Sequence, residues 1–298
     1  MKKIIIDTDI GDDIDDAYAI AFAVKLKKFE LQGITTVYRN SLQRAKIASA
    51  LLSVLGVGEK QVCVGEDYPP NCKFAIESFE EVLPDGRPVI PHYRDEFASA
   101  PVSSKRAAEF IAEQAEKYPG EITVIAIGPM TNLAEVAEKY QRSYKKLAKI
   151  VCMGGMFFGK KAEWNIRCDP ESAAAVLGGG VPVTFVGLDV TAYTYLTSED
   201  VAQITAFGGA ETKMLAGMLE KWVQTHPGRM PTMHDALTVA EAADCGFCRY
   251  EEKKIRIPLV GEKRAYTEES EEGVDVRVAV SVDREKFLGC FKQTLEQN

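Results

Sequence analysis

Six aspartates lie within ten residues near the start of the chain, with Asp7 the first and Asp16 the last. They directly follow three isoleucines at positions 4–6, which are typical of a buried strand. Like charges this close repel one another, and buried carboxylates take up protons unless a cation or hydrogen-bond donors hold them ionised. The segment is therefore either a solvated acidic turn that caps a helix or the site of a positive ion.

The spacing of these aspartates favours the ion. Asp7 and Asp9 are two residues apart on an extended segment, so their side chains point to the same side. Asp15 and Asp16 stand where a helix is predicted to begin, and the exposed N–H groups of a first helical turn favour carboxylates. Gly11 permits the sharp turn between the two pairs. The carboxylates are thus predicted to converge on one small volume, which suits a hard cation such as Ca²⁺ or Mg²⁺.

A phosphatase of the haloacid dehalogenase type is an alternative use of the same residues. The sequence DTD at positions 7–9, after an apolar strand, is similar to the start of that superfamily, in which the first aspartate is the nucleophile. In this alternative Asp7 would attack a phosphate ester with the help of Mg²⁺. The usual pattern has Thr or Val two residues after the second aspartate, whereas this chain has Gly11 and then four more acids.

The elements that must position these residues alternate between strand and helix. Strands are predicted at 2–7, 29–37, 121–127, 147–153 and 181–189, and a hairpin at 253–260 and 274–282. Helices are predicted at 15–28, 41–56, 103–118, 130–140, 169–178, 198–206, 211–225, 235–243 and 283–297. This alternation predicts an α/β fold, with one open, mostly parallel, Rossmann-like sheet and helices on both faces. Residues 63–102 read as a long surface excursion, and no linker divides residues 1–298 into more than one domain.

Composition limits the possible partners. Of 298 residues, 46% are hydrophobic and 27% charged, as in an ordinary globular protein, and the net charge is −8. This charge argues against nucleic acid or an anionic membrane as a partner. No apolar run is long enough to span a membrane, and the start MKKIIIDTD is too short for a signal-peptide core, which predicts a cytoplasmic chain. The seven cysteines, an odd number, do not suggest a disulfide framework.

In parallel sheets of this kind, ligands bind at the carboxyl ends of the strands. The segments there include GITTVYRN, AIGPMTNLA, VCMGGMF and VGLDVT. Together with DTDIGDDIDDAYAIAFA, AEWNIRCDPESA and MHDAL, they form seven motifs in order over about residues 4–240. This series resembles the inosine–uridine preferring nucleoside hydrolase family, whose N-terminal signature has the usual form D-x-D-P-G-x-D-D-A-x-A.

The resemblance implies a function and a set of residue roles. It implies hydrolysis of the N-glycosidic bond of ribonucleosides to ribose and free base, with a tightly held Ca²⁺, in a homodimer or homotetramer. The implied metal ligands are Asp9, Asp16, Asp235 and the main-chain oxygen of Ile127. Asp15 would be the general base, and Asn165 and Asp235 would hold the ribose 2′- and 3′-hydroxyls. Glu163 and Met153 would face the 5′ side of the sugar. His234 would lie near the leaving base, and Asn40 would take a base-side or supporting position.

Three departures from the family pattern leave alternatives open. The acidic turn is two residues longer than the usual form, so Asp12 or Asp13 could take over a ligand or base role. The segment before Glu163 contains no asparagine for a second contact to the 5′-hydroxyl, and the family's histidine-containing loop near residue 80 is absent. Base preference therefore stays open, as does a family member that binds a sugar or a metal without catalysis.

Overall fold

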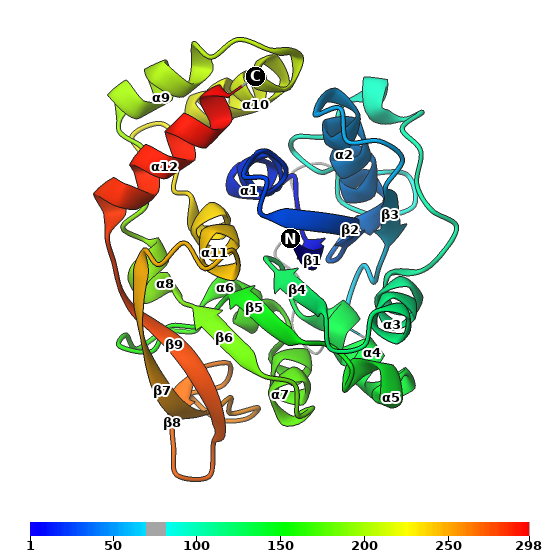
Figure 1. Ribbon diagram of the computed structural model, residues 1–298, viewed down its shortest axis with the longest axis vertical. Coiled ribbons are helices and arrows are strands. Elements are labelled where there is room, and N and C mark those ends of the chain that lie inside the picture. Colours follow the sequence, from blue (N-terminus) through cyan, green and yellow to red (C-terminus); the bar gives the residue numbers. More distant parts are fainter. Residues whose placement is uncertain (70–81, 298) are drawn as a thin grey trace.

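A nine-stranded, mostly parallel sheet forms the centre of the computed structural model, which describes residues 1–69 and 82–297 (Figure 1). The strands are β1 (Lys2–Thr8), β2 (Phe29–Thr36), β3 (Gln61–Val64), β4 (Ile122–Ala126), β5 (Lys149–Met153), β6 (Val183–Val186), β7 (Cys248–Arg256), β8 (Glu268–Glu269) and β9 (Val274–Val282). Their order is β3-β2-β1-β4-β5-β6-β9-β7-β8. The neighbours from β3 to β9 pair in parallel, whereas β7 pairs antiparallel with both β9 and β8. The predicted α/β fold is confirmed.

Helices cover both faces of this sheet. They are α1 (Asp15–Lys25), α2 (Ser41–Val54), α3 (Ala107–Lys117), α4 (Thr131–Lys139), α5 (Gln141–Tyr144), α6 (Trp164–Cys168), α7 (Pro170–Gly178), α8 (Leu188–Thr191), α9 (Ser198–Thr205), α10 (Ala210–Thr225), α11 (His234–Ala242) and α12 (Arg284–Glu296), with a 3₁₀ turn at Asp95–Phe97. Two apolar cores result. Ile4 and Ile6 of β1 enter the core built with α1, α2 and α11, whereas Ile5 enters the core built with α3, α4 and α7. The side chains of β1 thus alternate between faces, as a strand requires.

Some boundaries differ from the predictions. The predicted strand at 181–189 ends at Val186, because the carboxylate of Asp189 turns back to accept hydrogen bonds from the N–H groups of Phe157 and Phe158, and α8 begins at Leu188. The first hairpin strand is β7, which ends before Pro258, a residue that cannot donate to a ladder. Within the predicted excursion 63–102, residues 70–81 lie outside the described residues, and β3 overlaps its start.

The fold brings the ends of distant segments together at one edge of the sheet. Helix α1 follows β1 directly, and α11 packs against α1 and reaches β4, β5 and β6 (Figure 1). The first residues of α1 and α11 therefore meet above the carboxyl ends of the central strands, where the sequence predicts the site. Within the part of the chain that the structure describes, no helix is both long and apolar enough to cross a membrane.

Candidate active site

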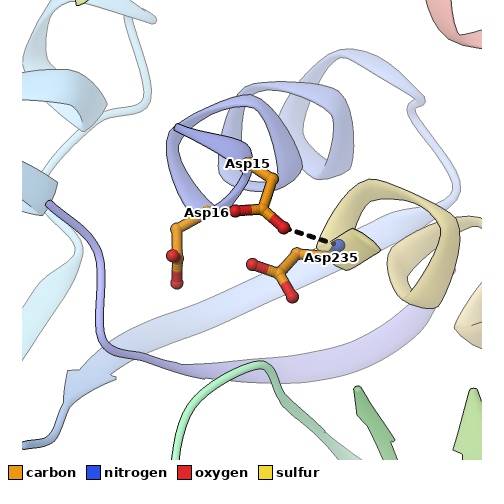
Figure 2. A group of neighbouring side chains, drawn as sticks. All are labelled: Asp15, Asp16 and Asp235. Carbon is orange, nitrogen blue, oxygen red and sulfur yellow. Dashed lines mark hydrogen bonds between the residues drawn. The ribbon is translucent and has the colours of Figure 1, made fainter. Parts of the chain in front are cut away.

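Three aspartates from two helices form a compact cluster. Asp15 and Asp16 open α1 and Asp235 lies in the first turn of α11, and one carboxylate oxygen of each lies within 4.8 Å of those of the other two. Figure 2 shows the three carboxylates pointing into the same space between the helices. The backbone N–H of Asp235 donates to Asp15 Oδ2 at 3.3 Å, which ties the two helix starts together. All three residues are buried.

The acidic loop is fixed from beneath by β1. The hydroxyl of Thr8 donates to Asp16 Oδ1 and accepts the N–H of Ile10, so the strand end sets the direction of one cluster carboxylate. Gly11 has a φ of +118°, and a Cβ there would lie 2.4 Å from a methyl of Ile90. A side chain at this position would be strained by both its conformation and its neighbours, so the loop needs glycine.

Burial and mutual repulsion make the cluster costly in its charged form. Burial is the main cause that raises the pKa of Asp15, Asp16 and Asp235 well above the usual value for aspartate, and neighbouring carboxylates raise these pKa values further. Burial likewise raises the pKa of Asp9, to about 7. A positive ion among these groups would oppose both effects, because an opposite charge favours the ionised form of a carboxylate.

The donor set fits a hard divalent cation. Buried carboxylates are the ligands of Ca²⁺ and Mg²⁺, which take oxygen ligands. Asp9 and Ile127 line the same cavity as the three clustered aspartates and add a further carboxylate and a main-chain carbonyl to that wall. The acidic cluster is thus suited to hold a metal, and its chemistry alone does not distinguish Ca²⁺ from Mg²⁺.

A cavity of about 530 Å³ opens above the cluster. All but one of the residues predicted to form the site line it, namely Asp9, Asp15, Asp16, Ile127, Met153, Glu163, Asn165, His234 and Asp235. The exception is Asn40, which is fully buried and caps α2, accepting the N–H of Gln43 and donating to the carbonyl of Pro88. The structure therefore places Asn40 behind the cavity wall, where it holds the β2–α2 connection.

Asn165 and Glu163 are held in fixed orientations beside the cluster. The amide nitrogen of Asn165 donates to the carbonyl of Met153 at 3.2 Å and lies 3.5 Å from that of Ile127. The side-chain oxygen of Asn165 is the acceptor atom of this amide. The carboxylate of Glu163 caps α6 and accepts the N–H groups of Gly155, Asn165 and Ile166. These bonds lower the pKa of Glu163, but burial outweighs them and raises it.

His234 reaches the cavity from the first residue of α11. Its Nδ1 lies 2.8 Å from the hydroxyl of Thr191 at the end of α8. Burial lowers the pKa of His234 to about 4, so the imidazole is neutral at neutral pH. A neutral imidazole whose Nδ1 accepts the threonine proton carries its hydrogen on Nε2.

The extra residues of the acidic loop face opposite walls of the cavity. The carboxylate of Asp12 lies 2.8 Å from Arg44 Nη2 and 3.5 Å from Arg39 Nη1. Asp13 faces the C-terminal end of α10, where Trp222 hydrogen-bonds to it and His226 and Arg229 lower its pKa by their charge, although burial raises that pKa overall. Neither carboxylate belongs to the three-aspartate cluster.

Several cavity residues have no role in the sequence predictions, although three of them, Arg39, Trp164 and Leu188, lie inside the predicted motifs. The residues without a predicted role are Arg39, Trp164, Leu188, Trp222, His226 and Arg229. Trp222 and His226 stack with ring centroids 4.5 Å apart and planes at 15°. In the sequence these residues form an ordinary i, i+4 pair of a helix end, and only the packing of α10 beside the acidic loop brings them to the cavity.

The phosphatase alternative does not fit this arrangement. Its nucleophile would be Asp7, which is fully buried beneath the cavity and accepts hydrogen bonds from the hydroxyl of Thr35 and the amide of Asn132. Asp7 does not line the cavity, so no substrate there can reach its carboxylate. Its place is structural, and it links β1 to β2 and to the start of α4.

Comparison with known proteins agrees with this site. Residues 4–289 match the inosine-uridine preferring nucleoside hydrolase family. The chain is 34% identical over 230 residues to uridine nucleosidase 1 of Arabidopsis thaliana, an alignment that covers 76% of this chain and 68% of the relative.

Two solved structures share the fold over nearly their whole length. A plant nucleoside hydrolase superposes with a TM-score of 0.86 at 26% identity, covering 100% of this chain and 99% of the other. A purine-preferring ribonucleoside hydrolase from Gardnerella vaginalis superposes with a TM-score of 0.83 at 29% identity, covering 99% and 98%. With its acidic cluster at the cavity floor and its family match along nearly the entire chain, the protein belongs to the inosine-uridine preferring nucleoside hydrolases and is a hydrolase of N-glycosyl compounds.

Proposed function

We propose that the protein hydrolyses ribonucleosides to ribose and free base with the help of Ca²⁺, and that Asp15 is the general base. The observation that carries this proposal is the convergence of Asp15, Asp16 and Asp235 at the floor of a cavity that Asn165 and Glu163 also line. Carboxylates and an amide on one wall can bind a cation and the vicinal hydroxyls of a ribose together.

Asp9, Asp16, Asp235 and the carbonyl of Ile127 would hold the ion. When bound, Ca²⁺ would supply positive charge that keeps these carboxylates ionised and acidifies a water or hydroxyl that it contacts. The oxygen donors of these side chains are already buried, and the hydroxyl of Thr8 directs the carboxylate of Asp16.

Asp15 handles the proton of the reaction. A water oxygen forms a bond to the anomeric carbon, the C–N bond breaks and its electron pair leaves with the base, while one water proton passes to Asp15. The departing base takes up a proton from solvent water, which gives the neutral free base. Burial and neighbouring carboxylates raise the pKa of Asp15, and a base with a raised pKa holds an abstracted proton more readily. The N–H of Asp235 directs the Asp15 carboxylate.

The polar wall orients the sugar. Asn165 has its amide donors directed at Met153 and Ile127, which leaves its side-chain oxygen to accept from a ribose hydroxyl. Asp235 would accept from the neighbouring hydroxyl. A 2′-deoxyribonucleoside would leave these buried groups unsatisfied, so the site is proposed to select ribose. Glu163 and Met153 would then face the 5′ side.

The base is proposed to leave toward α10. After burial, the charge of Asp13 is the largest cause that raises the pKa of Asp15, so these two carboxylates are neighbours. Trp222 of α10 hydrogen-bonds to Asp13. Because the general base must lie beside the anomeric carbon, that carbon and its base point toward the stacked Trp222–His226 pair. A planar base has apolar faces that suit such rings. His234 would lie at the edge of the same space as a neutral Nε2–H donor.

A nucleoside panel tests the proposal. Ribose release from uridine, cytidine, inosine, adenosine and guanosine is measured with Ca²⁺, with a chelator, and with Ca²⁺ restored. The relatives act on different bases by name, one being a uridine nucleosidase and another purine-preferring, so the panel spans both classes. Release that needs Ca²⁺ supports the proposal. Absence of release from every nucleoside with the ion present contradicts it, and ribose binding without turnover would instead indicate a non-catalytic protein.

Two further expectations stay proposals. We propose a homodimer or homotetramer, which light scattering on the purified protein would distinguish from a monomer. We also propose a cytoplasmic location, which fractionation of the source cells would test.

A further inference from the structure

Arg39 brings a positive charge to a cavity whose other charged residues are mostly acidic. It lies in the β2–α2 connection and lines the cavity, yet its side chain is nearly buried, with 8% exposed. Its φ is +59° and that of Tyr38 is +75°. Two successive residues other than glycine in the left-handed region are strained, so the surrounding structure must hold them there.

Contacts on three sides fix the guanidinium. It lies 3.5 Å from Asp12 through Nη1, and its carbon lies 4.8 Å from the ring centre of Tyr38 and 5.9 Å from that of Trp164. Arg44 holds the same Asp12 carboxylate more closely, at 2.8 Å, and also donates to the carbonyls of Asp9 and Ile10. The Asp12 charge is thus balanced by a fully buried arginine, and Arg39 adds positive charge to the cavity wall.

The contacts of the acidic loop give the cavity two ends. At one end Trp222 hydrogen-bonds to Asp13, and His226 stacks on the Trp222 ring. At the other, Arg39 stands with Asp12 and Trp164, and Trp164 lies between Glu163 and Asn165 in the chain. The proposed function directs the anomeric carbon and the base toward the first end. C1′ and C4′ flank the ring oxygen of ribose and their substituents diverge, so when the base points toward the first end, C5′ and its oxygen point away from it, toward Arg39.

We propose that Arg39 is the specificity-determining residue for the ribose 5′-oxygen, to which its guanidinium donates a hydrogen bond. The inference rests on the proposed function, which supplies the orientation of the sugar. The segment before Glu163 contains no asparagine that could make a second contact to the 5′-hydroxyl. In this proposal Arg39 supplies the missing hydrogen-bond donor.

Glu163 and Arg39 differ in the hydrogen bonds that they can form with a 5′-hydroxyl. Glu163 accepts three backbone N–H groups, so its carboxylate can accept from the 5′-hydroxyl but cannot donate to it while ionised. A guanidinium is always charged and offers several donors in a fixed plane. Together they would bind both the hydrogen and the lone pairs of the 5′-hydroxyl.

The test compares uridine with 5′-deoxyuridine in the wild type and in Arg39→Gln. For the wild type, kcat/KM is expected to be higher for uridine, and this ratio should fall about tenfold or more in the variant, as for loss of a hydrogen bond to a charged group. Values for 5′-deoxyuridine should change little. Arg94→Gln is the matched control, because Arg94 is exposed and pairs with Glu96, and its ratio should equal that of the wild type.

The variant Arg39→Gly is the control for misfolding. It removes the guanidinium, and it also relieves the left-handed backbone strain at this position. It should show the same fall in the ratio. An unchanged ratio in both variants, with native circular dichroism, overturns the proposal.

Calorimetry separates this outcome from failure of the proposed function. Wild type that turns over no nucleoside contradicts the proposed hydrolysis, yet tighter binding of uridine than of 5′-deoxyuridine, lost in Arg39→Gln, still supports the role of Arg39. Equal binding of the two nucleosides by the wild type overturns it.

Discussion

The guanidinium of Arg44, which has no exposed surface, donates from Nη2 to the carboxylate of Asp12 at 2.8 Å. The same group donates to the carbonyls of Tyr38, Asp9 and Ile10. One buried arginine of α2 therefore holds both the acidic loop after β1 and the connection after β2.

Breaking this pair should destabilise the fold. Asp12→Asn removes the carboxylate that pairs directly with the buried guanidinium, and we expect the free energy of unfolding to fall by about 2 kcal/mol, less than for a wholly buried pair because Asp12 is partly exposed. Urea denaturation of Asp12→Asn, Arg44→Met and the double variant measures the coupling between the two residues. Purely additive changes would contradict a direct interaction.

Removal of the Asp15 carboxylate should abolish proton transfer without unfolding the protein. For Asp15→Asn we expect kcat to fall by roughly 10²–10⁴, the usual contribution of a general base. Stability should stay the same or rise, because one of several repelling buried carboxylates is lost. Asp244→Asn, on the surface beside Lys2, is the control and should keep full activity. Near-normal turnover by Asp15→Asn would reassign the base.

Chelation should lower the melting temperature. Without a cation the buried carboxylates of Asp9, Asp16 and Asp235 repel one another, and a ligand that binds only the folded state stabilises it according to its concentration and affinity. Differential scanning fluorimetry with EGTA, then with excess Ca²⁺ or Mg²⁺, is expected to show a drop that Ca²⁺ reverses. A melting temperature that neither ion nor chelator alters would argue against a metal at this cluster.

His92 should make the protein less stable in mild acid. Burial, with smaller contributions from the charges of Lys221 and Arg94, lowers the pKa of His92 to about 4, although the charge of Asp12 opposes them. The unfolded chain, with a histidine pKa near 6.5, thus binds more protons than the folded chain between about pH 6.5 and 4. Stability therefore falls as the pH drops through this window, by up to about 3 kcal/mol from this residue.

The variant His92→Asn isolates that contribution. Its free energy of unfolding, measured by urea denaturation at pH 7 and pH 4.5, should fall less over this interval than that of the wild type. Parallel curves for the two proteins would show that His92 does not carry the effect.

The sequence predicted best what local patterns encode. The strand before Asp7 and the helix after Asp16 follow from hydrophobic periodicity, and the carboxylates at that junction follow from their spacing. Asp235 lies 220 residues from Asp15, and only the ordered series of motifs predicted that they meet. The same series of motifs predicted the nine site residues that line one cavity.

The remaining features depend on packing that no local pattern records. Asn40 looks the same in sequence whether it faces a ligand or caps a helix, and here it caps α2. Arg39 lies inside the motif GITTVYRN, but neither that motif nor the helical pattern before His226 indicates that these two side chains line the cavity. Both reach it through the packing of α2 and α10. The separate contacts of Asp12 and Asp13 likewise appear only in three dimensions.

The contacts of Asp12 and Asp13 connect the α2 and α10 sides of the cavity through two consecutive residues of the acidic loop. Asp12 is anchored to Arg44 on the α2 wall and Asp13 faces Trp222 on the α10 wall, yet consecutive Cα atoms are only about 3.8 Å apart. The walls cannot move apart independently while both contacts persist, so any ligand that shifts α10 also pulls on the loop that carries Asp15 and Asp16. The width of the cavity and the positions of its cation ligands are thus mechanically linked.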